Sequence, residues 1–195
     1  RTEVAGFMTI LHGDDRIYNN IFVQGTPVQA TEAKEDMEFV MIDNQVAGTS
    51  VFDGYPTYEE WVKPFDLEGT ANMFTMQEAH FSHLPVWIHG NAYLSGAKPW
   101  EKETENFVSS ELACISLTEE GGKWLLRSNL GELLREYKTG LINTSLLGKA
   151  FEPEERFENP DGSDILFDTD YAGNHRSIST VPGPFSQCKE EMIVG

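Results

Sequence analysis

Asp14 and Asp15 are adjacent carboxylates that follow His12 closely, and such groups can transfer protons in a catalytic site. In an extended chain, neighbouring side chains point to opposite faces, so the two carboxylates would not reach one substrate atom. Gly13, directly before them, is typical of a turn in which an aspartate hydrogen-bonds the nearby backbone. Three interpretations stay open for this segment: a structural turn, a loop that contacts a ligand, and a catalytic pair of carboxylates.

His80 and His83 are three residues apart, a spacing that places two side chains on one helical face. A zinc site needs a third and often a fourth ligand, and beyond nearby Glu78 the spacing identifies none. Residues 159–164 and 168–175 are loosely similar to calcium-binding loops but lack the alternating ligands and the closing glutamate. The sequence therefore predicts no metal site and no cofactor, with a structural calcium ion as the alternative.

The tryptophans are candidates for stacking against sugars, because aromatic rings and pyranose faces both present apolar surface. Trp87 and Trp124 lie inside apolar strand-like runs, which predicts that they belong to the core. Trp100 lies among charged residues in "AKPWEKE" and is the tryptophan that we predict to be an exposed ligand contact.

Asp14 and Asp15 lie between two short strand-like runs, residues 4–12 and 16–23, which must position the two carboxylates. Gly13 marks the turn between the two runs. Asn19 and Asn20 interrupt the second run, although asparagine is depleted in strands and tolerates a left-handed bend. The run is therefore either a strand that turns a corner and continues, as in one coil of a stacked β-structure, or an ordinary hairpin. The Asn-Gly pair typical of a tight hairpin is absent, which favours the corner.

A short helix is predicted after Thr57, because Thr57 and Glu60 have the spacing of a capping box and Pro64 ends the helix within two turns. Residues 37–43 are predicted to form a strand within a loop-rich stretch, and residues 71–83 a second helix.

From residue 85 onward, strand-like runs alternate with turn residues, which predicts a β-rich region. The runs cover residues 86–96, 113–130, 139–151 and 163–171, with a hairpin loop at 118–124 and a type I turn at 159–162. No internal repeat of 20 to 50 residues is visible, so any coils that stack on residues 16–23 are expected upstream of residue 1.

The formal charge of −18 argues against partners that present phosphate groups. A nucleic acid needs a basic stripe on the protein, and an anionic membrane surface also attracts basic segments. A neutral or cationic ligand is compatible. Cys114 and Cys188 make no disulfide framework in a chain of 195 residues. There is no apolar run of about 20 residues and no signal-peptide pattern, which predicts a cytoplasmic location.

The segment "TEVAGFMTILHGDDRIYNNIFVQG" (residues 2–25) closely resembles part of the β-xylosidases of glycoside hydrolase family 120. Residues 84–103, "LPVWIHGNAYLSGAKPWEKE", and residues 157–173, "FENPDGSDILFDTDYAG", are similar to the C-terminal region of the same family. The resemblance extends from Thr2 to about Gly173 and is most specific in residues 2–25 and in "NAYLSGAKPWEKE".

The resemblance implies a mainly β fold, in which the end of a right-handed parallel β-helix precedes a β-rich C-terminal region with one or two short helices. The implied divisions are residues 1–25 as the final β-helix strands, 26–84 as a loop-rich segment with a helix near 58–63, and 85–195 as a capping region. It implies release of xylose from short β-xylosides with retention of configuration, which requires two carboxyl groups about 5 Å apart. In the family these lie upstream of the "TEVAGF" segment, so the chain alone is expected to be inactive.

The resemblance also places the loop of Glu3 near the sugar cleft. The candidate contacts to a neutral xylo-oligosaccharide are therefore Glu3, His12, Asp14, Asp15 and Trp100. The expected partner is the upstream β-helix of the same enzyme, and a homo-oligomer is a further expectation. Two alternatives stay open: a non-catalytic carbohydrate-binding module, and a purely structural domain that forms an oligomer interface.

Overall fold

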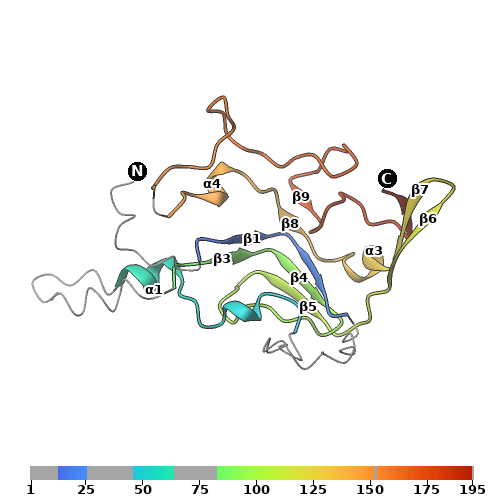
Figure 1. The fold of residues 1–195 in the computed structure, drawn as a ribbon, viewed down its shortest axis with the longest axis horizontal. Helices are drawn as coiled ribbons and strands as arrows, with labels where there is room; N and C mark the ends of the chain where they lie inside the picture. Colours follow the sequence, from blue (N-terminus) through green and yellow to red (C-terminus); the bar gives the residue numbers. More distant parts are fainter. Residues whose placement is uncertain (1–12, 26–45, 64–82, 152, 195) are drawn as a thin grey trace, which may run out of the picture.

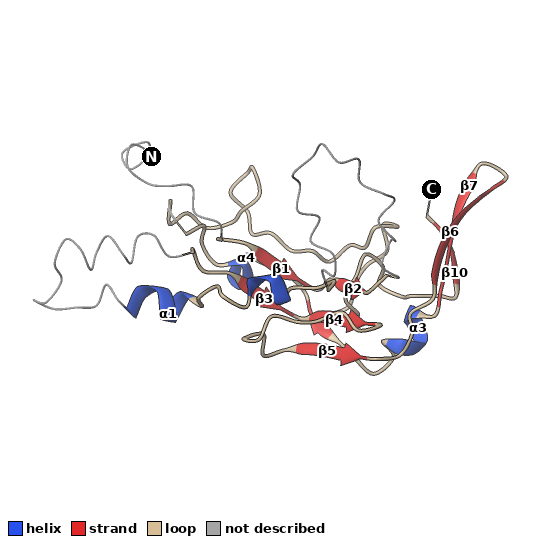
Figure 2. Cartoon of the chain, turned by 60° about the horizontal axis from the view of Figure 1, so that its bottom comes forward, coloured by secondary structure: helices blue, strands red, loops and turns tan. Residues whose placement is uncertain are grey.

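The structure is a computed structural model that describes residues 13–25, 46–63, 83–151 and 153–194. It is mainly β (Figures 1 and 2). The strands are β1 Arg16–Tyr18, β2 Ile21–Val23, β3 Trp87–His89, β4 Asn91–Leu94, β5 Asn106–Ser109, β6 Ile115–Glu120, β7 Lys123–Ser128, β8 Thr139–Gly140, β9 Ser179–Thr180 and β10 Glu191–Ile193. The helices are the 3-10 helix η1 Ser50–Phe52 and the α-helices α1 Tyr58–Val62, α3 Leu130–Leu133 and α4 Thr144–Leu147.

Parallel strands from distant parts of the chain stack in register (Figure 1). β1 pairs with β3, β2 pairs with β4, and β4 pairs with β5, all in the parallel sense. Between β1 and β2 the chain bends at Asn19, which has a φ of 54°, and between β3 and β4 it bends at Gly90, which has a φ of 73°. The two asparagines therefore form a corner between strands, and the hairpin alternative is wrong.

Asparagine side chains stack at this corner. Ile21 pairs with Ala92, so the residues directly before them, Asn20 and Asn91, occupy equivalent positions. Asn91 is in turn in register with Asn106. The Asn20 backbone N–H and Nδ2 both donate to Asn91 Oδ1, at 2.9 and 3.1 Å, and Asn91 Nδ2 donates to Ile17 O at 2.8 Å. Because buried backbone groups at a bend need partners, these amides stabilise the corner.

Two apolar clusters flank the corner. Ala92 and Leu94 of β4 pack with Leu130 and Leu134, and Val86 and Ile88 pack with Trp100. Ala92 and Leu94 alternate with Tyr93 along β4, and Val86 and Ile88 alternate with Trp87 along β3 and the residue before it. The two clusters fix the faces of these strands, because successive side chains of a strand point to opposite sides.

The predicted short helix and the predicted hairpin are confirmed. α1 begins after Thr57 with a complete capping box to Glu60, and β6 and β7 form an antiparallel hairpin. The hairpin and β10 make a small sheet that projects from the stack (Figure 2). The predicted turn is also present, since Gly162 N donates to Asn159 O at 2.9 Å.

The predicted strands at 139–151 and 163–171 are wrong in most of their length. The first contains the two-residue β8 and then α4, because Asn143 accepts a hydrogen bond from Leu146 N and caps a helix. The second makes only isolated bridges, such as that of Leu166 with Asn143. The predicted strand at 37–43 and the predicted helix at 71–83 lie outside the described residues, except for His83 at the end of the latter.

None of the described helices is long and apolar enough to cross a membrane. The described strands form small parallel and antiparallel sheets, so the mainly β class is confirmed and the right-handed parallel β-helix stays a prediction. The three proposed divisions of the chain also stay predictions.

Candidate functional site

One face of the β1–β3 pair points away from the core and carries large polar and aromatic side chains. Ile17 and Ile88 are in register and face the core, so the residues on either side of them face outward. These outward pairs are Arg16 with Trp87 and Tyr18 with His89. The face therefore presents a guanidinium, a phenol, an indole and an imidazole.

Arg16 closes one end of this face. Its guanidinium lies 3.9 Å from the centre of the Trp87 ring and 4.8 Å from that of Phe157. It donates hydrogen bonds to Leu147 O at 3.0 Å and to the Asp14 carboxylate, and its side chain is buried. Arg16 therefore holds Leu147 and Phe157 against β1.

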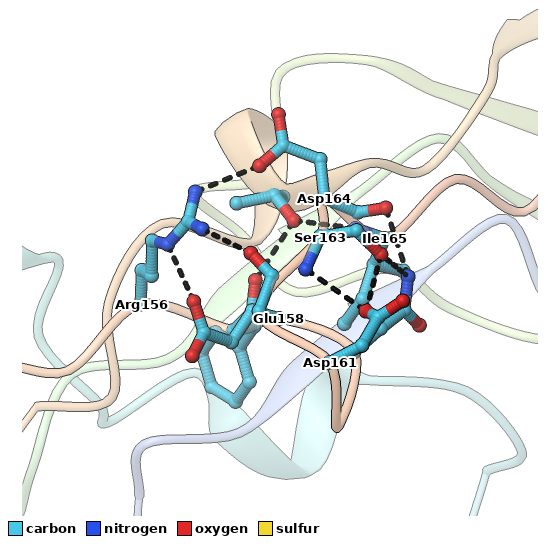
Figure 3. A network of polar contacts seen from close by, with 10 residues as sticks. Arg156, Glu158, Asp161, Ser163, Asp164 and Ile165 are labelled. Atoms are coloured by element: carbon cyan, nitrogen blue, oxygen red, sulfur yellow. Dashed lines mark hydrogen bonds and ion pairs between the residues drawn. The ribbon is translucent and has the colours of Figure 1, made fainter.

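The loop that carries Phe157 is itself held by polar contacts (Figure 3). The Arg156 guanidinium bonds to both Glu158 and Asp164 at 2.7 Å, and Asp161 accepts from Ser163 at 2.6 Å. Each exposed ion pair contributes little by itself, because water screens the charges. Together they restrict the loop, which keeps Phe157 on the Arg16 guanidinium.

The open part of the face is a groove of about 300 Å³, a volume in the range of small-ligand pockets. The rings of Tyr18, Tyr58 and Trp87 line it, and Tyr58 stacks on Trp87 with ring centres 6.4 Å apart. The remaining lining residues are Thr57, Glu59, Val86, Ile88, His89, Trp100 and Leu146. We call this the aromatic groove.

Helix α1 positions two of the groove residues, Tyr58 and Glu59. Lys102 Nζ donates to Glu60 at 2.7 Å and to Tyr55 O at 3.0 Å, which ties the helix to the segment after β4. The bonds from Lys102 and from the Thr57 backbone lower the pKa of the Glu60 carboxyl. The helix therefore presents Tyr58 from a fixed base at the edge of the groove.

The polar groups of the groove belong to Tyr18, His89 and their neighbours. Burial raises the pKa of the Tyr18 hydroxyl, although the Arg16 charge opposes this, so Tyr18 is a neutral donor near pH 7. The Tyr18 and His89 rings meet edge to face at 6.2 Å. His89 Nε2 lies 3.5 Å from a Glu105 oxygen, which orients the imidazole.

Behind the groove, Glu103 is the centre of a buried polar network. It accepts from Asn91 Nδ2 at 2.9 Å and from Tyr93 Oη at 2.6 Å, and Thr49 Oγ1 lies 2.6 Å from that same Tyr93 oxygen. Burial raises the pKa of Glu103 although both hydrogen bonds oppose it. The network joins β4 to the segments of Thr49 and Glu103, and Thr49 Oγ1 also accepts from the Trp100 backbone N–H at 2.8 Å, so it supports the corner.

The structure places the carboxylates predicted as ligand contacts in different surroundings. Asp14 bonds to Arg16 through one oxygen and accepts from Phe151 N at 3.0 Å through the other. Its φ of 60° and that of 134° at Gly13 describe a tight turn. Asp15 is exposed, and its carboxylate has no partner among the described residues. Both oxygens of Asp14 therefore bond within the fold, which agrees with the structural-turn interpretation for this residue.

Two other predicted contacts, Glu3 and His12, lie outside the described residues. Trp100 was predicted to be exposed, and that placement is wrong: it is 3% exposed and packs with Val86 and Ile88, although it also lines the groove. Charged neighbours in the sequence were misleading, because Lys102 points back to bond with Glu60 across the chain.

Three aromatic residues of the groove, Tyr18, Tyr58 and Trp87, were not among the predicted ligand contacts. Trp87 was predicted to be core, but Val86 and Ile88 take the inner positions and leave Trp87 outward. Trp124 is also not core and is 44% exposed. The sequence of residues 86–89 contained evidence for this arrangement, because alternate residues of a strand lie on the same face. With Val86 and Ile88 on the inner face, Trp87 and His89 lie on the outer one.

No group of three or more possible metal ligands occurs within the described parts of the chain. His83 stacks on Tyr55, with ring centres 4.1 Å apart. In the loop 168–175, Asp170 accepts from Asn174 N at 2.8 Å and Ser186 Oγ at 2.7 Å, so hydrogen-bond donors surround its carboxylate. Both cysteines, Cys114 and Cys188, are free thiols.

No protein-family model matches this chain, and no curated protein matches it. Among solved structures, the chain is similar to XylC, determined in complex with xylose, with a TM-score of 0.72 and 28% identity. The similarity covers 94% of this chain and 26% of XylC, so the chain spans about a quarter of XylC's length. The chain therefore shares its fold with a part of a xylose-binding protein.

Proposed function

We propose that this chain binds neutral xylo-oligosaccharides in the aromatic groove, as part of a xylosidase-type glycoside hydrolase. The observation that carries the proposal is a set of three rings that line one groove: Tyr18 and Trp87 on the outward face of a parallel strand pair, and Tyr58 of helix α1 against Trp87. Rings of this kind offer apolar surface to sugar C–H groups, while the Tyr18 hydroxyl and His89 offer hydrogen bonds. XylC, which has a similar fold, was solved with xylose.

The catalytic carboxylates are proposed to lie upstream of this chain, in the β-helix of the complete enzyme. A retaining glycosidase needs two carboxyl groups about 5 Å apart. Among the described residues that line the groove, Glu59 is the single carboxylate. The groove as described can therefore hold a sugar but cannot supply both roles.

The parallel stack supports a capping role for the chain. In the described part of the chain, β1 pairs only with β3, and β2 is an edge strand of its sheet. Unpaired strand edges bind further strands readily. An upstream coil of the same enzyme is the proposed partner for these edges, and Asp15, directly before β1, would then lie near the junction.

A second candidate function, an oligomer interface, rests on the projecting sheet of β6, β7 and β10. Its exposed apolar side chains include Leu117 at 55%, Trp124 at 44% and Ile193 at 59% exposure. Exposed apolar residues gathered on one element are typical of protein contacts. Measuring the mass in solution of the chain and of a Leu117→Glu variant tests this function, since an interface would dissociate in the variant.

Titration of xylobiose and xylotriose into the purified chain, followed by calorimetry or by tyrosine and tryptophan fluorescence, tests the sugar proposal. Tyr58→Ala removes an exposed ring of the groove without disturbing the core and should weaken binding by about tenfold, corresponding to about 1.4 kcal/mol. Trp124→Ala is the matched control, because Trp124 is similarly exposed but lies on the projecting hairpin.

Equal affinities of the Tyr58→Ala variant and the unmodified chain would contradict the assignment of the groove. In the same preparation, hydrolysis of a nitrophenyl xyloside should stay at the background rate, because Glu59 is the single carboxylate among the described residues of the groove. Turnover by the isolated chain would refute the upstream placement of the catalytic pair. Binding without turnover also agrees with a carbohydrate-binding module.

A further inference from the structure

A second hollow, of about 510 Å³, shares Tyr18 with the aromatic groove. It forms where the corner at Asn19 and Asn20 meets the C-terminal segments. Two exposed rings line it, Phe167 at 54% and Tyr171 at 72% exposure. Because Tyr18 lines both spaces, one extended ligand can occupy both.

The hollow also contains a buried positive charge. Arg176 lines it and is 9% exposed. The Arg176 guanidinium donates to Gly183 O at 2.6 Å and, through its other terminal nitrogen, to Val181 O and Thr180 Oγ1 at 3.3 Å each. All three acceptors are neutral oxygens. A guanidinium has five N–H donors, so these bonds leave donors for a further acceptor.

No carboxylate forms an ion pair with Arg176 in the described parts of the chain, although 32 acidic residues occur in the sequence. Asp170 is committed to Ser186 and Asn174. Asp168 bonds to the Thr169 hydroxyl and lies 3.8 Å from His175. Because leaving a buried charge without a counter-charge is unfavourable, an anion that enters the hollow gains a strong interaction.

We propose that this hollow binds a sugar that carries a carboxylate, a hexuronic acid residue, with the carboxylate on Arg176 and the ring against Phe167 and Tyr171. The inference rests on the proposed function, because it extends a neutral oligosaccharide in the aromatic groove across Tyr18 to an acidic substituent. The mixed lining favours a sugar acid over a phosphate or polyanion. The hollow offers rings and one guanidinium, while the net charge of −18 repels ligands of high negative charge.

Calorimetric titrations of the full chain with three ligands test the proposal: xylotriose substituted with one glucuronic acid, unsubstituted xylotriose, and free glucuronate. At low salt we expect the substituted xylotriose to bind at least about tenfold more tightly than the neutral one. One charge-assisted hydrogen bond is sufficient for a difference of this size. The preference should fall as salt is added.

Arg176→Gln should remove the preference for the acidic ligand and leave the affinity for neutral xylotriose unchanged. Arg156→Gln is the matched control, because Arg156 is an arginine in an exposed ion-pair network outside the hollow. If Arg176→Gln fails to fold, Tyr171→Ala replaces it, since Tyr171 is 72% exposed and its removal should also weaken binding of the acidic ligand alone.

The outcomes separate this inference from the proposed function. Equal affinity of the unmodified chain for the acidic and neutral ligands overturns the inference and leaves the aromatic groove intact. Binding of glucuronate that depends on Arg176, without binding of neutral xylotriose, supports the hollow and contradicts the groove. A preference for the acid that survives in Arg176→Gln also overturns the inference.

Discussion

Gly90→Ala should destabilise the protein through the corner of the stack. Gly90 has a φ of 73°, and an added Cβ would lie 2.4 Å from Asn19 Oδ1. The left-handed backbone costs an ordinary residue about 1–2 kcal/mol. To relieve the contact, the Asn19 amide must turn and lose its 2.8 Å hydrogen bond to Gly140 O, at a further cost of about 1 kcal/mol. The expected loss is about 2–3 kcal/mol.

Gly122→Ala is the matched control, because Gly122 has a φ of 76° and open space around its added Cβ. Its expected cost is the backbone part alone, about 1–2 kcal/mol. The reduction in unfolded-chain entropy is the same in both variants and cancels in the comparison. Equilibrium urea unfolding of both variants gives the two free energies.

A double-mutant cycle isolates the contact between the two corners. Asn19→Gly keeps the left-handed bend accessible and removes the amide, so Gly90→Ala in that background should cost no more than Gly122→Ala. If Gly90→Ala and Gly122→Ala are equally destabilising, or if Asn19→Gly leaves the cost of Gly90→Ala unchanged, the stacked-corner reasoning is refuted.

Three further predictions concern the interior. Burial raises the pKa of Glu103, so the folded protein holds the carboxyl proton more tightly than the unfolded chain does. The free energy of unfolding should therefore fall as pH rises from about 4.3, the value in the unfolded chain, through the raised pKa. Urea unfolding at several pH values should show a smaller fall for Glu103→Gln. Burial alone would raise the pKa of Asp170, but hydrogen bonds from Ser186 and Asn174 outweigh burial and lower the pKa. Asp170→Asn should therefore destabilise the protein at pH 7, and the loss of stability should become smaller as pH falls toward 2. Thermal unfolding over this pH range measures the loss. Leu94→Ala, at a fully buried position, should cost about 2–5 kcal/mol in urea unfolding.

Local patterns predicted the elements that depend on neighbouring residues. The capping box at Thr57 and Glu60 acts within one helical turn, and the turn that Gly162 closes spans four residues. The corner at Asn19 and Asn20 was also predicted, because asparagine adopts the left-handed bend readily. Each of these depends on backbone chemistry that a few residues determine.

The groove could not be predicted in the same way, because the stack assembles it from distant segments. Tyr18 meets His89 only through the pairing of β1 with β3, and Tyr58 reaches Trp87 only because Lys102 ties α1 down. A search for repeats of 20 to 50 residues missed the match between "IYNNIFV" and "IHGNAYL", since Asn20 and Asn91 are 71 residues apart.

The spacing of the stacked amides has a consequence for how such a chain changes over time. The chain returns to the same corner after 71 residues between Asn20 and Asn91, but only fifteen residues separate Asn91 from Asn106, its partner in the next strand. The asparagines at the bends therefore set the register of the strands, and the length of the chain segment between two bends does not. Segments of very different size can be inserted, trimmed or exchanged at these excursions, so new ligand contacts can be acquired while the layers beneath keep their alignment.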